Sequence, residues 1–290
     1  MSKWVLGVLG GSGLYEIDGL ENAREEQISS PWGEPSGSVM RGNMGDVELV
    51  FMPRHGKGHR LSPTHVNYQA NIDVLKRAGV TDILSISAVG SLQQQYAPGH
   101  FVFIDQFIDR TFAREKSFFG DGCVAHVSMA HPICERLSQL AYEAGQAVGA
   151  TCHKGGTYMV MEGPQFSTFA ESQLYRSWGC DVIGMTNMPE AKLAREAEIP
   201  YATVAMVTDY DCWHEEEDDV SVENVLKIMA ANSSNAKELI KTLCAGLQGT
   251  PRTNGTQGIE SCLDFAIMTP ADVRNPELMA KLDAVAGRVL

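Results

Sequence analysis

The feature that most constrains the fold is the alternation of short apolar runs with helix-forming segments along most of the chain. Several runs are apolar on both faces, as strands covered by helices on each side should be. The alternation predicts a single doubly wound α/β domain over residues 1–290, with a twisted, mixed, mostly parallel central sheet flanked by helices. The expected strands are Trp4–Leu9, Val47–Met52, Asp82–Ser87, Phe101–Asp105, Thr157–Met161, Asp181–Met185 and Tyr201–Val207.

Capping residues indicate where the helices begin and end. Ser62 is suited to an N-cap and Pro63 to the first helical position, so a helix is expected from there to about Ala78, where Gly79 stops it. A further helix should begin at residues 188–190 (MPE) and end before Pro200. The remaining expected helices are Ile133–Val148, Thr168–Trp178 and Ser221–Leu247.

The end of the chain is expected to contain a loop followed by a helix. Residues 248–258 (QGTPRTNGTQG) are rich in Gly, Thr and Asn and are expected to form a loop. Residues 276–290 can form a closing amphipathic helix. This helix could act as a swinging lid or pack as a tail, and the packed tail is the favoured alternative.

The charge of the chain limits its partners. The formal net charge is -13, with a pI near 5.0. Such an acidic surface argues against nucleic acid or an anionic membrane as the main partner. It leaves room for a small anionic substrate, because a local Arg/His site can bind phosphate within a negative protein.

Cysteine usage and the N-terminus predict a cytoplasmic enzyme. The seven cysteines are odd in number and none stands in a C-x-x-C spacing, so neither a disulfide framework nor a zinc site is expected. The apolar run after Trp4 is too short for a signal peptide or a membrane span. Free thiols in a reducing compartment are the natural interpretation.

Three loops that follow predicted strands could bind an anion together. They are residues 10–13 (GGSG), residues 53–60 (PRHGKGHR) and residues 87–91 (SAVGS). Glycines let backbone N–H groups approach an anion, and Arg presents a planar fork for two phosphate oxygens. A tight turn or a solvated basic loop would explain any one of them. Ligands of open α/β sheets collect at the carboxyl edge of the strands, so the agreement of three loops indicates one anion site.

Two later segments add polar groups at the same edge. Thr186 precedes a helix N-terminus, where free N–H groups and the helix dipole favour anions, and it could cap the helix, bind phosphate, or do both. Asp209 and Asp211 follow a buried strand and could bind the N–H groups of a ligand. A carboxyl group in a partly dry pocket can act as a general acid. The acidic run at residues 215–219 is expected to be a solvated loop.

Taken together, these motifs resemble the purine nucleoside phosphorylase family over roughly residues 4–245. The segment at residues 208–213 (TDYDCW) narrows the implied substrate to 5′-methylthioadenosine, which would be cleaved to adenine and 5-methylthioribose 1-phosphate. The motifs that carry the resemblance are residues 10–14 (GGSGL), 54–56 (RHG), 66–71 (VNYQAN), 87–91 (SAVGS), 105–111 (DQFIDRT), 162–167 (EGPQFS) and 185–186 (MT).

The resemblance implies a homotrimer with sites near subunit interfaces, no metal or organic cofactor, and inorganic phosphate as co-substrate. His126 would be lent by a neighbouring subunit to the 5′ end of the nucleoside. Phe166 would pack on the purine and Met185 beside the ribose 2′-hydroxyl. Gly184 departs from the family pattern, which often has Asn there. The implied phosphate ligands are Ser12, where Thr is often found, and Arg54, His55, Ser87, Ala88 and Thr186.

A methylthio group calls for an apolar 5′ pocket. Val222, Val225 and Leu226 fall on one face of a predicted helix, and the resemblance puts Val222 beside the 5′ group. Core packing would explain the same periodicity. Ser167 and Val222 are the candidate specificity residues.

The expected chemistry is acid-assisted departure of the base. A purine is a poor leaving group as an anion, so Asp209 would protonate N7 while Asp211 accepts a hydrogen bond from the 6-amino group. Three alternatives stay open: a phosphorylase of 6-oxopurine nucleosides such as inosine or methylthioinosine, a hydrolytic nucleosidase, and a non-catalytic nucleoside- or phosphate-binding protein.

Overall fold

The computed structural model of the protein describes residues 3–11, 13–14, 16–214 and 222–290. In this part of the chain eleven strands form one mixed sheet. All seven predicted strands are present, with boundaries shifted by a few residues. Their bounds are β1 (Val5–Gly10), β4 (Val47–Pro53), β5 (Asp82–Ser91), β6 (Phe101–Phe103), β9 (Thr157–Val160), β10 (Val182–Gly184) and β11 (Tyr201–Asp209).

Four further strands escaped the sequence prediction because they lack an apolar pattern or are very short. β2 (Glu21–Glu26) has the sequence ENAREE and is exposed along nearly its whole length, and β3 (Val39–Met44) joins it to the sheet. β7 (Gln106–Asp109) and β8 (Cys152–Lys154) are short and only partly buried. These strands extend the sheet at its margins, where burial no longer dictates composition.

Strand β5 organises the centre of the sheet. Its first half pairs in parallel with β1 and its last two residues pair with the antiparallel β10, while β11 runs parallel to it along the other side. The sheet order is β2-β3-β4-β1-β5-β10-β9-β7, and β11 connects β5 to β6 and β8. The carboxyl ends of β1, β4, β5 and β11 therefore meet at one edge, as the α/β prediction required.

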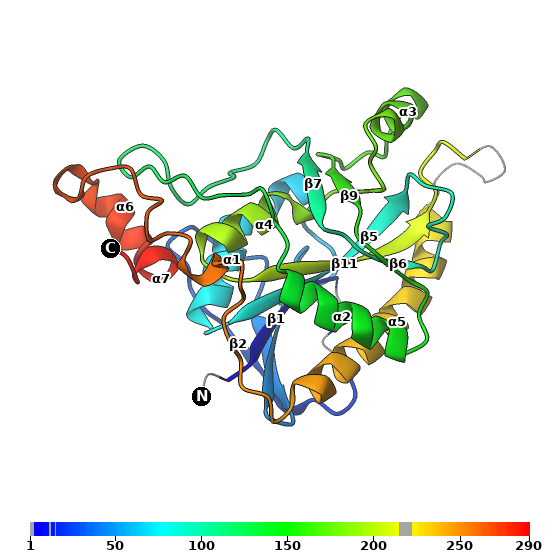
Figure 1. The fold of residues 1–290 in the computed structure, drawn as a ribbon, viewed down its shortest axis with the longest axis horizontal. Coiled ribbons are helices and arrows are strands. Elements are labelled where there is room, and N and C mark those ends of the chain that lie inside the picture. The colour runs from blue at the N-terminus through cyan, green and yellow to red at the C-terminus, as the bar shows by residue number, and fades with distance from the viewer. Residues whose placement is uncertain (1–2, 12, 15, 215–221) are drawn as a thin grey trace.

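Helices cover both sides of this sheet. α1 (Tyr68–Arg77) packs with α4 (Asn187–Glu196), and α2 (Glu135–Ala147) packs with α5 (Val222–Leu247). Figure 1 shows the two pairs on opposite sides of β11. α3 (Phe169–Ser177) projects beyond the sheet and begins with a capping box between Thr168 and Glu171. In the described residues, no helix is long and apolar enough to cross a membrane.

One predicted helix start was wrong, and another was confirmed. Ser62 and Pro63 begin only a short 3₁₀ turn, η1 (Pro63–His65), and the Ser62 side chain makes no capping hydrogen bond. α1 begins later because the Asn67 side chain accepts from the Ala70 N–H at 3.0 Å and caps it. The start of α4 was predicted at residues 188–190, and the regular helix does begin there, directly after Met188, which has extended backbone angles (φ -120°, ψ 132°).

The C-terminal segment packs as a tail. Instead of the single helix expected over residues 276–290, it forms α6 (Pro276–Lys281) and α7 (Asp283–Ala286), because the backbone turns out of the helical region at Leu282. Leu282, Val285 and Ala286 are buried, and Arg77 of α1 forms an ion pair with Asp283. In this structure the segment closes over α1, and α6 and α7 lie at one end of the molecule (Figure 1).

Candidate active site

The segments that the sequence singled out converge at the carboxyl edge of the sheet, although residues 87–91, predicted as a loop, form the second half of β5. Gly10 pairs with Pro53 across β1 and β4, and the Arg54 N–H donates to the Gly10 carbonyl at 3.0 Å. On the other side of β5, Ser87 lies in register with Ala205 and Gly90 with Asp209 of β11. The pairing of parallel strands thus brings the anion loops and the acidic segment to one place.

Arg54 is almost fully buried there, with 2% of its surface exposed. Its Nε and Nη2 donate to the two carboxylate oxygens of Glu190 at 2.7 and 2.9 Å. Nη1 donates to the Ile86 carbonyl at 3.1 Å, and Nη2 also donates to Ser85 Oγ at 2.6 Å. Burial opposes the charge, but Glu190 outweighs it and raises the pKa of Arg54. Among the described residues, Nη1 makes only the one hydrogen bond to the Ile86 carbonyl, which leaves its second N–H as a possible donor.

His55 is held neutral beside this cation. Burial first, and the neighbouring Arg54 second, lower its pKa to about 4. Its Nδ1 lies 2.9 Å from the Leu61 carbonyl, which can only accept, so the proton is assigned to Nδ1. The Nε2 of the neutral ring is then an acceptor, and the His59 ring stacks on His55 with centroids 4.1 Å apart.

Two hydroxyl groups face each other on the next elements. Ser87 Oγ in the second half of β5 lies 3.5 Å from Thr186 Oγ1 at the start of α4, and both residues are buried. Thr186 makes no side-chain capping hydrogen bond, so of the roles considered for it capping is absent and ligand binding remains. Ala88, next to Ser87, is half-buried.

Gly184 is explained by Tyr158. A Cβ added at Gly184 would lie 2.0 Å from the Tyr158 hydroxyl, so a side chain at 184 and a tyrosine at 158 exclude each other. The hydroxyl of Tyr158 instead hydrogen-bonds Ser87 Oγ at 2.9 Å. Tyr158 of β9 therefore occupies the space that a side chain at position 184 would take. It is a site residue that sequence reasoning missed.

Asp209 and Asp211 form a fixed acidic pair at the end of β11. Asp209 accepts from Thr208 Oγ1 at 2.6 Å through Oδ2 and from the Asp211 N–H at 2.8 Å through Oδ1. Burial raises the pKa of both carboxyl groups, more than their hydrogen-bond donors lower it. The hydroxyls of Ser172 and Ser167 lie near Asp211, yet no described group completes a hydrogen bond of normal geometry with its Oδ2.

The segment before α3 borders this pair. Cys212 Sγ donates to the Ser167 carbonyl at 3.4 Å, and the neighbouring Phe166 is 46% exposed, leaving its ring open to solvent. Gly163 lies so close to Met185 that a Cβ there would approach its Sδ to 2.5 Å. Ser167, Phe166 and Met185 are thus brought to the same edge as Asp211.

A buried ion pair that the sequence did not reveal supports these segments. Arg114 Nε donates to Glu162 Oε1 at 2.9 Å, and Arg114 Nη1 donates to the carbonyls of Met185 and Met188 at 2.6 and 2.7 Å. Glu162 also accepts from Thr64 Oγ1 at 2.6 Å. Glu162 stood in a quoted motif, but nothing in the sequence connected it to Arg114, 48 residues away.

Among the described residues, no hydrogen bond or strand pairing places Val225, Leu226 or His126 with this group. Ser12, the Val222 side chain and residues 215–219 lie outside the described residues. Val225 is half-buried, whereas Leu226 is 59% exposed in this single chain. His126 is exposed, and its backbone N–H donates to the Ala266 carbonyl at 2.9 Å. Across the described ranges, no cluster of three or more His, Cys, Asp or Glu side chains could hold a metal ion.

The geometry combines hydroxyl and Arg donors for an anion with two buried carboxyl groups on the neighbouring strand. A family model described as "Phosphorylase superfamily" matches residues 5–245. The chain belongs to the phosphorylase superfamily.

Relatives within this superfamily match almost the whole chain. An S-methyl-5′-thioadenosine phosphorylase of Cereibacter sphaeroides is 60% identical, covering 99% of this chain and 99% of its own. One of Rhodospirillum rubrum is 59% identical over 99% of this chain and 97% of its own. The structure of a methylthioadenosine phosphorylase from an Antarctic soil metagenomic library superposes with a TM-score of 0.92 at 44% identity, covering 98% of this chain and 99% of that one.

A more distant structure carries a ligand. Methylthioadenosine phosphorylase from Schistosoma mansoni, in complex with adenine, superposes with a TM-score of 0.81 at 37% identity and covers 88% of this chain and 95% of its own. The α/β prediction is confirmed by these comparisons as well as by the sheet itself.

Proposed function

We propose that this enzyme cleaves 5′-methylthioadenosine with inorganic phosphate and releases adenine and 5-methylthioribose 1-phosphate, as a step of purine and methionine salvage. The observation that carries the proposal is the register of β5 and β11, which sets Asp209 opposite Gly90, three residues along β5 from Ser87. A nucleoside bound there would have Asp209 and Asp211 beside its base and the phosphate site of Ser87 and Thr186 beside its ribose. Relatives named for this activity are 46–60% identical over nearly their full lengths.

Phosphate binds between the three loops. The hydroxyls of Ser87 and Thr186 and the remaining Nη1 N–H of Arg54 donate to its oxygens, with Ala88 beside them and Ser12 as a further ligand. Because Nδ1 of His55 already donates to the Leu61 carbonyl, Nε2 accepts a hydrogen bond from a protonated phosphate oxygen. Glu190 fixes Arg54 before phosphate arrives, so little reorganisation is needed on binding.

The base leaves with the help of the two acids. A phosphate oxygen attacks C1′ as the C1′–N9 bond breaks, and the ribosyl centre passes through a cation-like state that the phosphate anion stabilises. Asp209, whose pKa is raised by burial, donates its proton to N7. Asp211 accepts a hydrogen bond from the 6-amino group, which favours adenine over a 6-oxo base.

The rest of the nucleoside meets less polar groups. Phe166 packs on the purine, Met185 lies beside the 2′-hydroxyl, and Ser167 and Val222 set specificity. Val222, Val225 and Leu226 line the 5′ pocket, which His126 of a neighbouring subunit completes in a homotrimer. The exposure of Leu226 and His126 in the single chain is in keeping with such completion. We expect a cytoplasmic enzyme that needs no metal or organic cofactor.

The substrate assignment is tested by release of free base from methylthioadenosine, methylthioinosine and adenosine, each with and without phosphate, and with EDTA present throughout. Phosphate-dependent adenine release, fastest from methylthioadenosine, is expected. Faster release from methylthioinosine would make the protein a 6-oxopurine phosphorylase, release without phosphate would make it a nucleosidase, and binding without turnover would make it a nucleoside-binding protein.

A further inference from the structure

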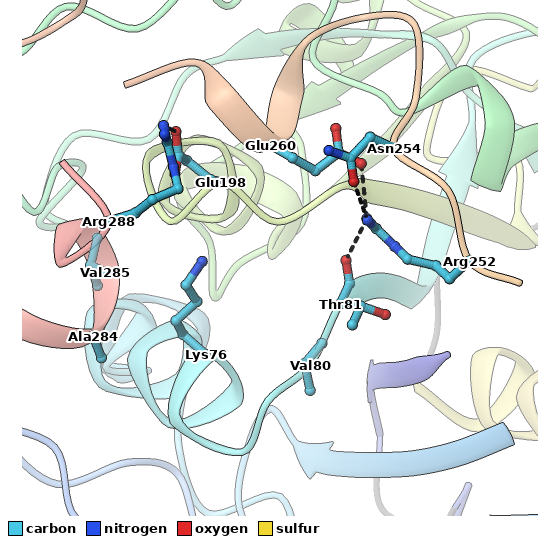
Figure 2. Close-up of a pocket in the computed structure, with 10 residues that line it drawn as sticks. All are labelled: Lys76, Val80, Thr81, Glu198, Arg252, Asn254, Glu260, Ala284, Val285 and Arg288. Atoms are coloured by element: carbon cyan, nitrogen blue, oxygen red, sulfur yellow. Dashed lines mark hydrogen bonds and ion pairs between the residues drawn. The ribbon is translucent and has the colours of Figure 1, made fainter. Parts of the chain in front are cut away.

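A cavity of about 250 Å³ lies at the opposite edge of the sheet, and its lining includes the residues just before β5. Its charged side chains are largely satisfied by the protein itself. Arg252 pairs with Glu260 and Arg288 pairs with Glu198 on facing sides of the space (Figure 2), and the ammonium group of Lys76 donates to a backbone carbonyl at 2.6 Å. A hydroxyl group with two acceptors for its single proton lies instead in the candidate active site.

That hydroxyl belongs to Thr208, which lies where the register of β11 against β5 shifts, as in a β-bulge. Val207 pairs with Val89 of β5 and Asp209 pairs with Gly90, so β11 advances by two residues while β5 advances by one. In a regular strand, neighbouring side chains point to opposite faces of the sheet. The shift breaks this alternation and allows the side chains of Thr208 and Asp209 to meet, with Oγ1 2.6 Å from Oδ2.

The single proton of this hydroxyl can point in two directions. Thr208 Oγ1 lies 3.1 Å from the carbonyl oxygen of Val89 as well as 2.6 Å from Asp209 Oδ2. When the proton points to Val89, Oδ2 must carry a proton of its own and donate to Oγ1, because two bare lone pairs would otherwise face each other at this short distance. When the proton points to Oδ2, the carboxyl group is ionised.

These two arrangements match the two protonation states of Asp209. In the acid form, hydrogen bonds run from Asp209 Oδ2 to Thr208 Oγ1 and on to the Val89 carbonyl. In the carboxylate form, the hydroxyl turns about its C–O bond and donates to Oδ2. The other carboxylate oxygen, Oδ1, accepts from the Asp211 N–H at 2.8 Å in both forms. Both forms of the acid are therefore hydrogen-bonded without movement of the side chain.

Few other groups act on this carboxyl. Burial raises the pKa of Asp209, the Thr208 hydroxyl and the Asp211 N–H lower it, and the charge of Asp211 raises it again. The facing strands contribute no charge, because Gly90 of β5 and Ile183 of β10 are the neighbours there. Among the described residues, Thr208 is thus the only side chain that donates to Asp209.

We propose that Thr208 is a positioning residue whose hydroxyl turns with the proton of Asp209 during catalysis. The inference rests on the proposed function, in which Asp209 protonates N7 of the leaving purine. The Asp209 O–H bond breaks as the N7–H bond forms, phosphate bonds to C1′, and the electron pair of the C1′–N9 bond passes to the base. The Thr208 proton meanwhile turns from the Val89 carbonyl to the new carboxylate. No proton leaves Thr208, and the acid form returns when water reprotonates Asp209.

The test measures kcat for adenine release from methylthioadenosine against pH, at saturating phosphate, in the full-length protein. Thr208→Val keeps the shape of the side chain but loses the hydroxyl, and Thr208→Ser keeps the hydroxyl. A hydrogen bond to a charged acceptor is roughly twice as strong as one between neutral groups, so its loss should disfavour the carboxylate about tenfold relative to the acid. In Thr208→Val, the highest kcat should fall about tenfold, and the decline of kcat at high pH should move up by about one pH unit. Thr208→Ser should keep the wild-type decline.

Circular dichroism verifies that each variant is folded, and Thr208→Ala carries the same expectation if Thr208→Val is not. An equal loss of kcat at every pH would indicate lost packing alone and overturn the inference, as would a Thr208→Ser variant that behaves like Thr208→Val.

Asp209→Asn, measured in parallel, separates this inference from the proposed function. If Asp209→Asn loses turnover while Thr208→Val matches the wild type, only the role of Thr208 is overturned. If Asp209→Asn keeps near wild-type turnover, the acid role of Asp209 and the role of Thr208 are both overturned.

Discussion

Replacing Asp209 with Asn removes a proton while keeping the shape of the site. The side chain is fixed by two donors, Thr208 Oγ1 at 2.6 Å and the Asp211 N–H at 2.8 Å. The Asn carbonyl can keep the bond from Asp211, and the Thr208 hydroxyl can turn to accept from the new amide. The substitution Asp209→Asn therefore isolates proton donation from packing.

The magnitude follows from the role assigned to this group. General acid catalysis by a positioned side chain contributes typically 10²–10⁴ in rate, or about 3–5 kcal/mol of the barrier. An amide can still hydrogen-bond N7 but cannot transfer a proton, so kcat should fall by roughly 10²–10⁴. Phosphate affinity should change little, because none of the described hydrogen bonds joins Asp209 to Arg54, His55 or Thr186.

The assay is steady-state adenine release from methylthioadenosine at saturating phosphate, with phosphate binding measured separately by calorimetry. In the wild type, kcat should decline as pH rises through the pKa of Asp209, which burial raises, because the acid form is the active one. The Asn variant should lack this limb. A variant with near wild-type kcat, or one that loses phosphate binding to the same degree as turnover, would refute the acid role.

Three further substitutions test the packing at Asp209 and two buried carboxyl groups of α4. Gly90→Ala would place a Cβ 2.9 Å from Asp209 Oδ1, so kcat/KM should fall at least about tenfold with the fold retained; unchanged kinetics would show that the carboxyl position is not critical. Glu190→Gln leaves Arg54 buried without its counter-charge, and urea denaturation should show a decrease of about 3–5 kcal/mol in the free energy of unfolding. A decrease under about 1 kcal/mol would contradict a stabilising role of the Arg54–Glu190 ion pair. Burial raises the pKa of Glu196 to about 7, above its unfolded value of 4.5, so the folded state binds the extra proton between these values. Wild-type stability should then fall by up to about 3 kcal/mol as pH rises from 4.5 to 7, and the variant Glu196→Gln should lack this contribution to the pH dependence; identical profiles for the two proteins would exclude a shifted Glu196.

Strands buried on both faces could be predicted from sequence because burial dictates their composition. β1 and β11 are apolar almost throughout, and the Gly and Asp residues of the site lie at or just after their ends. β2 could not be found in this way, since an exposed edge strand with the sequence ENAREE has no apolar pattern to detect. Local pattern also placed Ser62 as a helix cap, although Asn67 takes that role once the chain packs.

The candidate site likewise contains residues that local sequence patterns predict and residues that they do not. Residues in loops directly after strands were predictable because the topology of parallel strands brings those loops together. Their supporting partners were not, because they come from elsewhere in the chain: Glu190 reaches Arg54 across 136 residues. The fit of Tyr158 into the space above Gly184 likewise depends on the pairing of β9 with β10, which no local pattern encodes.

The central claim is that phosphate is the nucleophile. It is tested most directly by ³¹P NMR of a reaction containing enzyme, methylthioadenosine and inorganic phosphate, with adenine measured in the same sample. The account predicts that one sugar 1-phosphate forms and one inorganic phosphate disappears for each adenine released. Adenine released with the phosphate signal unchanged would contradict it.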